Sequence, residues 1–355
     1  MPDSRQEIEI SETMKLKTIL TLTFLLLFSA LEAQELPIKN LDAKVDVSTD
    51  VLQAYVGFYK IEAMSLVIEV TAEQDKLYVE VAGMGKILLQ AGSHTAFAAK
   101  ALEAQIEFMD IGKQAQSIKL YQGGSVLEGQ RTAAPKEHDY QAIALGSDQL
   151  DYQMNFTPFE SEWDLIINDR KVGTAKVDLR HGIYEGIPSY EGGSIIRYES
   201  MGNKPFADRS HFAKNDFAPL QSRNAISQKE EITTHYRFNT ANQYTIDIDN
   251  GEIKSTNQIK FDSQVFSTGI YKILAMDLKE GLAVKFPIPG INGLAWEKAL
   301  VVKKEKLQIP GLEGEFDTWR IEYSSGTIKW VSEKAPYLIQ WQMPTGMTWK
   351  LKHFQ

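Results

Sequence analysis

The last part of the chain, residues 311–354, has the pattern of four short strands in succession. Apolar and charged residues alternate over 319–323, as they do in a strand with one buried and one solvated face. The chain then returns through 327–331, 337–341 and 347–352, and turn residues separate these runs at Gly326, Pro336 and Gly346. Such a meander requires a β-sheet, so it constrains the fold class more than any other stretch.

Tryptophan is concentrated in this part of the chain. Five of the six tryptophans lie between Trp296 and Trp349, and the last four of them fall on the inward positions of the expected strands. Large aromatic side chains contribute much of the buried area of a core, so we expect the meander to anchor the core of its domain. Trp319, Trp330 and Trp341 are also candidates for the lining of an apolar pocket or for a sugar-stacking platform.

Length and turn spacing divide the chain into two modules. A chain of 355 residues is long for one domain and suits two. Short strand patterns with frequent turns predict a small antiparallel, barrel-like sheet over 50–132 and a larger curved sheet or half-barrel over 151–355. Polar segments at 34–49 and 133–150 are the expected linkers. The predicted fold class is therefore mainly β, with two antiparallel modules.

One helix is expected within the larger module, over 267–279. The apolar residues Ile270, Ile273, Leu274 and Leu278 recur there at helical spacing, and a glycine follows as a stop. A helix of this kind packs its apolar side across one face of a curved sheet, or closes one end of it. Ile273 and Leu274 are therefore candidates for the wall of a ligand pocket.

Residues 1–33 have the pattern of a secretory signal peptide. Two lysines precede an apolar run over 19–30, and Ala33 offers a small residue at a cleavage point. The pattern begins at Met14, which we expect to be the true start. The alternative, a membrane anchor, needs roughly 20 apolar residues, more than the run provides. Because no cysteine is present to carry a lipid, the processed chain is expected to be periplasmic or secreted.

The order of motifs over 50–132 points to a family. It runs through Tyr55-Val56-Gly57-x-Tyr59, Leu77-Tyr78, Leu88-Leu89 with Thr95 and Phe97, Ile106-x-Phe108 and Lys119-Leu120. In this order the segment resembles the small accessory β-domain appended to serine β-lactamase-like hydrolases, whose nucleophile lies in a separate domain, in a Ser-x-x-Lys motif. The sequence contains neither Ser-x-x-Lys nor Gly-x-Ser-x-Gly. The resemblance therefore implies the accessory domain without its hydrolase.

A second resemblance covers most of 160–355. It is carried by the stretch from Asp262 to Gly281, by Gly311-x-x-Gly314-x-Phe316-Asp317-Thr318-Trp319, and by Trp330-Val331-Ser332 before Ala335-Pro336-Tyr337. These motifs are similar to those of a family of uncharacterised exported β-proteins of bacterial envelopes. The resemblance implies a shape like the open half-barrels that carry lipids or lipoproteins across the periplasm, which is an analogy of fold alone. It implies no catalytic residue.

Composition and motif spacing argue against several kinds of site. The chain has 38 basic and 47 acidic residues without a basic patch, so no nucleic-acid partner is expected. The lack of cysteine excludes a thiol nucleophile and a disulfide framework. The six histidines show no metal-ligand spacing, and only His181 and His211, near Glu185 and Asp216, are a pair to check for proximity. We therefore expect no metal and no cofactor.

Three functions remain open on the sequence. The first is a non-enzymatic periplasmic protein that binds an apolar or lipid-like molecule within a curved sheet, with the pocket candidates Ile273, Leu274, Trp319, Trp330 and Trp341. Packing in a core is the alternative for each of these residues. The second function is a structural or interaction module that docks an envelope protein or a polysaccharide. The third is a hydrolase whose site combines carboxylates with histidine. The oligomeric state is left open.

Overall fold

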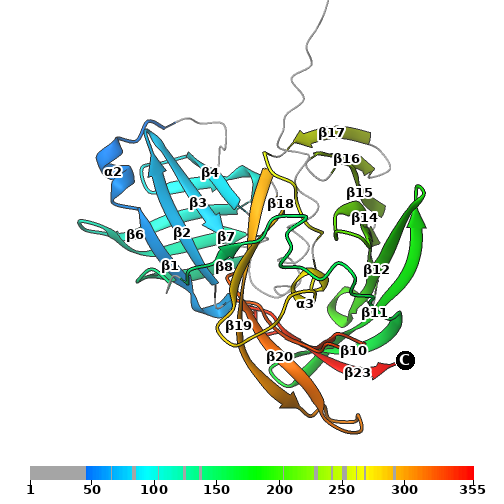
Figure 1. Ribbon diagram of the computed structural model, residues 1–355. Coiled ribbons are helices and arrows are strands. Elements are labelled where there is room, and N and C mark those ends of the chain that lie inside the picture. The colour runs from blue at the N-terminus through cyan, green and yellow to red at the C-terminus, as the bar shows by residue number, and fades with distance from the viewer. Residues whose placement is uncertain are drawn as a thin grey trace, which may run out of the picture.

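The computed structural model describes residues 45–355, which form two β-structures (Figure 1). Within that range the positions not described are 65, 82–84, 103, 123–124, 136–137, 203, 228–230, 241–242, 250–253, 261, 268 and 291–292. The signal-peptide pattern at 1–33 and most of the linker expected at 34–49 lie outside the described residues. The fold class is confirmed as mainly β, with a small barrel followed by a larger curved sheet.

The first β-structure is a closed barrel of eight strands, in which β1 pairs with β8. Its strands are β1 (Gly57–Ile61), β2 (Leu66–Glu73), β3 (Lys76–Val81), β4 (Gly85–Ala91), β5 (Ala96–Ala99), β6 (Ala104–Ile111), β7 (Ala115–Gln122) and β8 (Ser125–Thr132). The helix α2 (Thr49–Gln53) precedes them, and the 3₁₀ turns η3 (Glu62–Met64) and η4 (Lys100–Leu102) lie between strands. Closure leaves the barrel without the open edges of a flat sheet. Aromatic rings fill the interior, where Tyr55 stacks on Phe108 with ring centroids 4.2 Å apart.

Arg131, on β8, ties the ends of the barrel together. Its guanidinium donates hydrogen bonds to the backbone carbonyls of Ala54, Val56 and Ala115 and to the hydroxyl of Tyr59. Two of these carbonyls belong to the segment between α2 and β1, and the third to the first residue of β7. A guanidinium presents five N–H donors in one plane, so this one side chain satisfies acceptors from separate parts of the barrel.

The second β-structure is a 15-stranded sheet that curves strongly (Figure 1). Its strands are β9 (Gln141–Ala142), β10 (Phe159–Ile167), β11 (Arg170–Tyr184), β12 (Ile187–Tyr198), β13 (Pro205–Ala213), β14 (Pro219–Ser227), β15 (Glu231–Thr240), β16 (Gln243–Asp249), β17 (Lys254–Lys260), β18 (Ala283–Gly290), β19 (Gly293–Leu307), β20 (Phe316–Tyr323), β21 (Ile328–Val331), β22 (Leu338–Gln342) and β23 (Thr348–Phe354), with a 3₁₀ turn η5 (Glu199–Met201). Their order is β17-β16-β15-β14-β13-β12-β11-β10-β23-β22-β21-β20-β19-β18-β9. Neighbours are antiparallel, except that β9 pairs with β18 in parallel.

The register shows which face of the large sheet is apolar. Ile321, Lys329, Trp341 and Trp349 are paired in a row across β20 to β23, and residues directly opposite in antiparallel strands lie on the same face. Ile321 packs in one cluster with the helix α3 (Tyr271–Leu274), which lies inside the curve of the sheet in Figure 1. We call this the concave face and the opposite one the convex face.

Two apolar clusters cover the concave face. The helix cluster surrounds α3 and joins it to the segment before β10 and to inward residues of β18–β21; it includes Phe156, Ile273, Leu274, Trp319 and Tyr337. The tryptophan cluster lies on β10–β13, β22 and β23, with a contribution from the segment after β19; it includes Trp163, Leu165, Ala175, Trp349 and Leu351. The large sheet therefore has its main core on one face, filled partly by its own connecting segments.

Helix α3 is shorter than the sequence pattern predicts. It spans Tyr271–Leu274, a single turn, instead of 267–279. Gly269 has a φ of +113°, which helices do not use. The ammonium of Lys272 donates hydrogen bonds to the carbonyls of Ser267 and Gly269, at 3.2 and 2.9 Å, so these carbonyls bind a side chain instead of extending a helical ladder. No helix in the described part of the chain is long and apolar enough to cross a membrane.

Replacing Gly57 with alanine is expected to loosen the closure of the barrel. Gly57 has a φ of +150°, and a β carbon there would overlap Nη1 of Arg131. The guanidinium would have to leave its carbonyl acceptors, and this backbone region strains residues other than glycine. We expect the free energy of opening the barrel to fall by about 1–3 kcal/mol. Faster amide hydrogen exchange in peptides from β1 and β8 measures this loss.

Gly112→Ala is the matched control, because Gly112 lies in the same barrel with open space around it. Exchange in β1 and β8 should be unchanged in this variant. All six tryptophans lie outside the barrel, so tryptophan fluorescence should report an unaltered large sheet in both variants. Equal exchange in Gly57→Ala and the unaltered protein would contradict the role given to Arg131.

Candidate functional site

Three of the five pocket candidates lie together in the helix cluster. Ile273 is fully buried, Leu274 is 3% exposed and Trp319 is 9% exposed. Their cluster is made of the protein's own side chains, with Phe156 and Tyr337 among the aromatic members. This part of the concave face is therefore occupied by core packing, which was the alternative interpretation of these residues.

The other two candidates lie elsewhere on the sheet. Trp341 packs against the tryptophan cluster, where its ring centroid lies 4.7 Å from that of Trp349. Trp330 pairs with Arg320 and so lies on the convex face. There its indole N–H donates to Glu305 at 2.8 Å, and the guanidinium of Arg320 covers the ring. The structure thus brings Trp341 to the concave face but separates Trp330 from the other four candidates.

A buried ion pair lies beside the helix cluster. Lys272, on α3, is 2% exposed, and its ammonium lies 2.9 Å from Oε1 of Glu297 on β19. The ammonium also binds the two carbonyls of the preceding segment and lies 5.4 Å from the ring centroid of Phe286. Lys272 therefore has a counter-charge and hydrogen-bond acceptors in a place where an unpaired ion would be costly.

A second lysine, Lys329 on β21, lies on the same face with different surroundings. Its side chain is partly exposed, and its ammonium lies 4.6 Å from the ring centroid of Tyr323 and 5.4 Å from that of Trp341. Burial lowers the pKa of the Lys329 amine; Glu297 opposes this shift and Lys272 adds to it. Burial raises the pKa of the Tyr323 hydroxyl well above its usual value.

Lys272, Glu297, Tyr323 and Lys329 form the inner charged cluster. With both lysines protonated, its two ammonium groups and one carboxylate sum to one positive charge. The cluster joins α3 to β19, β20 and β21, so it lies at the boundary between helix cluster and sheet. Excess positive charge in a partly desolvated place favours the binding of an anion.

The sequence does contain a signal for this cluster. Glu297 is in phase with Ala295 and Ala299, which are buried, and Lys329 is in phase with the buried Val331. A charged residue on the apolar phase of a strand is unusual, since buried charges need partners. Strand alternation alone is enough to mark Glu297 and Lys329 as unusual, but it does not show that the two residues face one another.

His181 and His211 do not form a metal site. His181 pairs with Tyr190 and His211 with Glu191, so the two histidines lie on opposite faces. Nε2 of His181 lies 2.8 Å from the carbonyl oxygen of Phe156. Over the whole described part of the chain, no group of three or more side chains is arranged to hold a metal ion.

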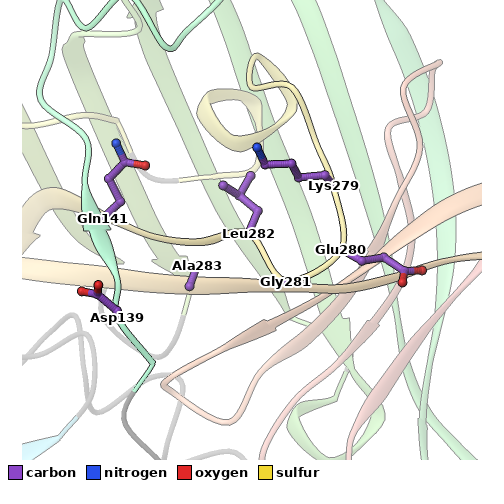
Figure 2. A pocket seen from close by; sticks show the side chains of 7 residues that line it. All are labelled: Asp139, Gln141, Lys279, Glu280, Gly281, Leu282 and Ala283. Carbon is purple, nitrogen blue, oxygen red and sulfur yellow. The ribbon is translucent and has the colours of Figure 1, made fainter.

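A separate pocket lies between the second linker and the segment after α3 (Figure 2). It has a volume of about 490 Å³ and is lined by Asp139, Gln141 and residues 279–283. Figure 2 shows Asp139 and Gln141 on the β9 side and the remaining residues on the other. None of the five candidates contributes to its lining, nor does the inner charged cluster. Our candidate site is the partly exposed concave surface at Lys329 and Trp341, which lies apart from this pocket.

Replacing Glu297 with glutamine should destabilise the large sheet. The change removes the carboxylate that pairs with the buried Lys272, for which losses of about 3–5 kcal/mol are typical. Urea unfolding followed by tryptophan fluorescence measures the loss. Glu315→Gln removes an exposed pair with Lys306, 3.2 Å apart, and should cost less than about 1 kcal/mol. Equal unfolding midpoints for the two variants would rule out a stabilising buried pair.

Comparisons with known proteins cover both parts of the chain. A family model described as "Protein of unknown function (DUF3108)" matches residues 151–352. The chain is also similar to Penicillin-binding protein 4* of Bacillus subtilis (strain 168), with 35% identity over 89 residues, or 25% of this chain. The match covers 20% of that protein, so the chain spans about a fifth of the length of this relative. This similarity is consistent with the accessory domain expected over 50–132. No solved structure matches the chain.

The family match coincides with the structure that carries the candidate site. It begins just before β10 and ends within β23, and so spans the two strands that pair in the middle of the large sheet. It covers more than half of the chain. The chain therefore belongs to the DUF3108 family, whose function is unknown.

Proposed function

We propose that the chain is an exported, non-enzymatic periplasmic protein that binds an apolar or lipid-like molecule on the concave face of its large sheet. One observation carries the proposal: apolar side chains around the tryptophan cluster remain partly exposed there, among them Val177, Ile196 and Trp341. Apolar surface inside a curved sheet binds apolar ligands because both surfaces leave water. The signal-peptide pattern at 1–33 supports export.

The proposed contact surface differs from the pocket expected on the sequence. Ile273 and Leu274 are enclosed in the helix cluster, so a ligand would reach them only by displacing α3. Trp341 is the candidate that combines the concave face with partial exposure. The ligand is therefore expected on strands β10–β12 and β21–β23, beside the helix cluster and not within it.

Two indole N–H groups without a partner in the described part of the chain indicate that the bound molecule also carries polar atoms. The N–H groups of Trp341 and Trp349 are buried, and within the described residues neither has a hydrogen-bond partner. Buried donors of this kind are nearly always paired with protein or with water. A carbonyl, hydroxyl or other polar group of a bound molecule would supply the acceptor.

The test is native mass spectrometry on the protein isolated from its own cell envelope without detergent, together with lipid extraction. We expect an added apolar mass that is released on unfolding. Ile196→Glu should reduce its occupancy about tenfold or more, because the change places a carboxylate on the apolar contact surface. A protein that is free of added mass in every preparation would contradict the proposal.

Ile195→Glu is the matched control. Ile195 and Ile196 are consecutive, of the same type and both partly buried. Ile196 pairs with Ala175 of the tryptophan cluster, whereas Ile195 pairs with Lys176 and faces the convex side. The control variant should keep its bound mass. Equal loss from both variants would show that the effect comes from general destabilisation of β12.

A second candidate function is docking of an envelope protein or polysaccharide, and the hairpin between β11 and β12 favours it. Ile183 and Ile187 at its end are 76% and 42% exposed. They pair with Pro188 and Tyr184, so each face of the hairpin tip presents one aliphatic side chain to a partner. A photo-crosslinking residue at position 183 should capture a defined partner in cells if this function is correct. The same residue at Lys176 on the convex face is the control and should capture none.

A further inference from the structure

Lys329 is an ammonium that the described part of the chain leaves without a hydrogen-bond acceptor. Its contacts are with the ring faces of Tyr323 and Trp341. Cation–π contacts of this kind are worth about 0.5–2 kcal/mol, and they occupy none of the three N–H donors with an oxygen. Lys329 is partly exposed as a residue, while its amine lies deep enough for burial to lower its pKa, so a head group has to enter from the concave face to reach it.

Lys272 lies on the same face and does have oxygen partners, so the lack of a hydrogen-bond acceptor among the described residues is specific to Lys329. Lys272 has one carboxylate and two carbonyl oxygens within 3.2 Å of its ammonium. Glu297 is therefore already engaged by a fully buried partner. Glu297 acts on Lys329 through its charge, but it forms no ion pair with it. Within the inner charged cluster, Lys272 therefore has a carboxylate in contact, whereas Lys329 has none in the part of the chain that the structure describes.

Two neighbours of Lys329 carry further hydrogen-bond donors that have no partner within the described residues. The hydroxyl of Tyr323 is buried and has no hydrogen-bond partner within the described residues, and the same holds for the indole N–H of Trp341. Burial raises the pKa of Tyr323, so its hydroxyl keeps its proton and can donate. A group that satisfies these donors must accept hydrogen bonds, and the excess positive charge selects an anion.

The surroundings of this position are apolar on both sides along the strand row. Ile321 precedes Lys329 in the row and belongs to the helix cluster. Trp341 and Trp349 follow it; Trp349 belongs to the tryptophan cluster and Trp341 packs against that cluster. A small inorganic anion would leave this apolar surface in contact with water. A molecule that joins an acidic group to a hydrocarbon chain would cover it.

We propose that Lys329 and Tyr323 bind the acidic head group, a carboxylate or a phosphate, of an amphiphile whose hydrocarbon part lies against the tryptophan cluster. This inference rests on the proposed function and names the class of ligand that the concave face takes. The head group receives hydrogen bonds from the ammonium and the phenol, and its charge neutralises the excess positive charge of the inner charged cluster.

The experiment titrates the full chain, stripped of lipid, with three probes that share a twelve-carbon chain. Dodecanoate carries a carboxylate, dodecyl phosphate carries a phosphate, and dodecanol is neutral; binding is followed by tryptophan fluorescence below the micellar concentrations. We expect at least one acidic probe to bind about 10- to 100-fold more tightly than dodecanol, the range of a charge-assisted hydrogen bond. The better of the two acids distinguishes a fatty acid from a phospholipid-like ligand.

Lys329→Met keeps the apolar stem and removes the ammonium. It should reduce the preference for the acid over the alcohol to about twofold or less, while dodecanol binds as before. Tyr323→Phe, which removes only the hydroxyl, should reduce the preference by about 3- to 10-fold. Because the ammonium of Lys329 has no oxygen partner within the described residues, its loss should leave the urea midpoint unchanged or raised, so the variant remains folded for the titration.

Lys285→Met is the matched control. Lys285 is partly exposed, and its ammonium lies 5.3 Å from the ring centroid of Trp296. It therefore resembles Lys329 in its contact with an indole, but it alternates with Phe286 of the helix cluster and faces the convex side. This variant should keep the full preference for the acid.

The outcomes separate this inference from the proposed function. Acids and dodecanol that bind equally to the unaltered protein would overturn the role of Lys329 and leave an apolar binding protein. A preference for acid that Lys285→Met abolishes as fully as Lys329→Met would overturn the assigned site. A chain that binds none of the three probes would overturn the proposed function as well.

Discussion

The ion pair between Lys272 and Glu297 is the interaction on which the concave face depends. Helix α3 has only four residues, and a single turn has little stability of its own in water. Its lysine joins it to β19 and also holds the carbonyls of the segment before it. Ile273 and Leu274 then reach the core of the sheet. Without this pair, the buried ammonium would oppose the packing of the two side chains beside it.

The division of the concave face into a filled and a partly exposed part follows from that attachment. The helix cluster is occupied by segments of the protein itself, so it contributes stability. Around the tryptophan cluster, apolar side chains retain contact with solvent, and it is there that we propose a ligand binds. Lys329, whose ammonium has no carboxylate in contact within the described residues, lies where the two parts meet. The same curved sheet thus supports a core and a surface of similar composition side by side.

Much of the fold could be predicted from the sequence because strand alternation is local. The run over 319–323 lies within β20, and its odd-numbered members face the core. The extent of α3 could not be predicted, because Lys272 turns inward to a carboxylate on a distant strand. The face of Trp330 depends on its pairing with Arg320, and a one-residue shift of register reverses the face of every side chain. Strand alternation marks Lys329 and Glu297 as charged residues on apolar phases, but only the assembled sheet places them together.

The strand order of the large sheet has a consequence for how the molecule is made. Strands β10 to β17 pair in chain order, and so do β18 to β23. The two series join where β10 pairs with β23, as Trp163 does with Leu351. Each series can form from local contacts, whereas the join must wait until β23 has been synthesised, and long-range pairing of this kind slows folding. If such a chain crosses a membrane unfolded, the late pairing of β23 delays closure of the sheet and so leaves more time for transport.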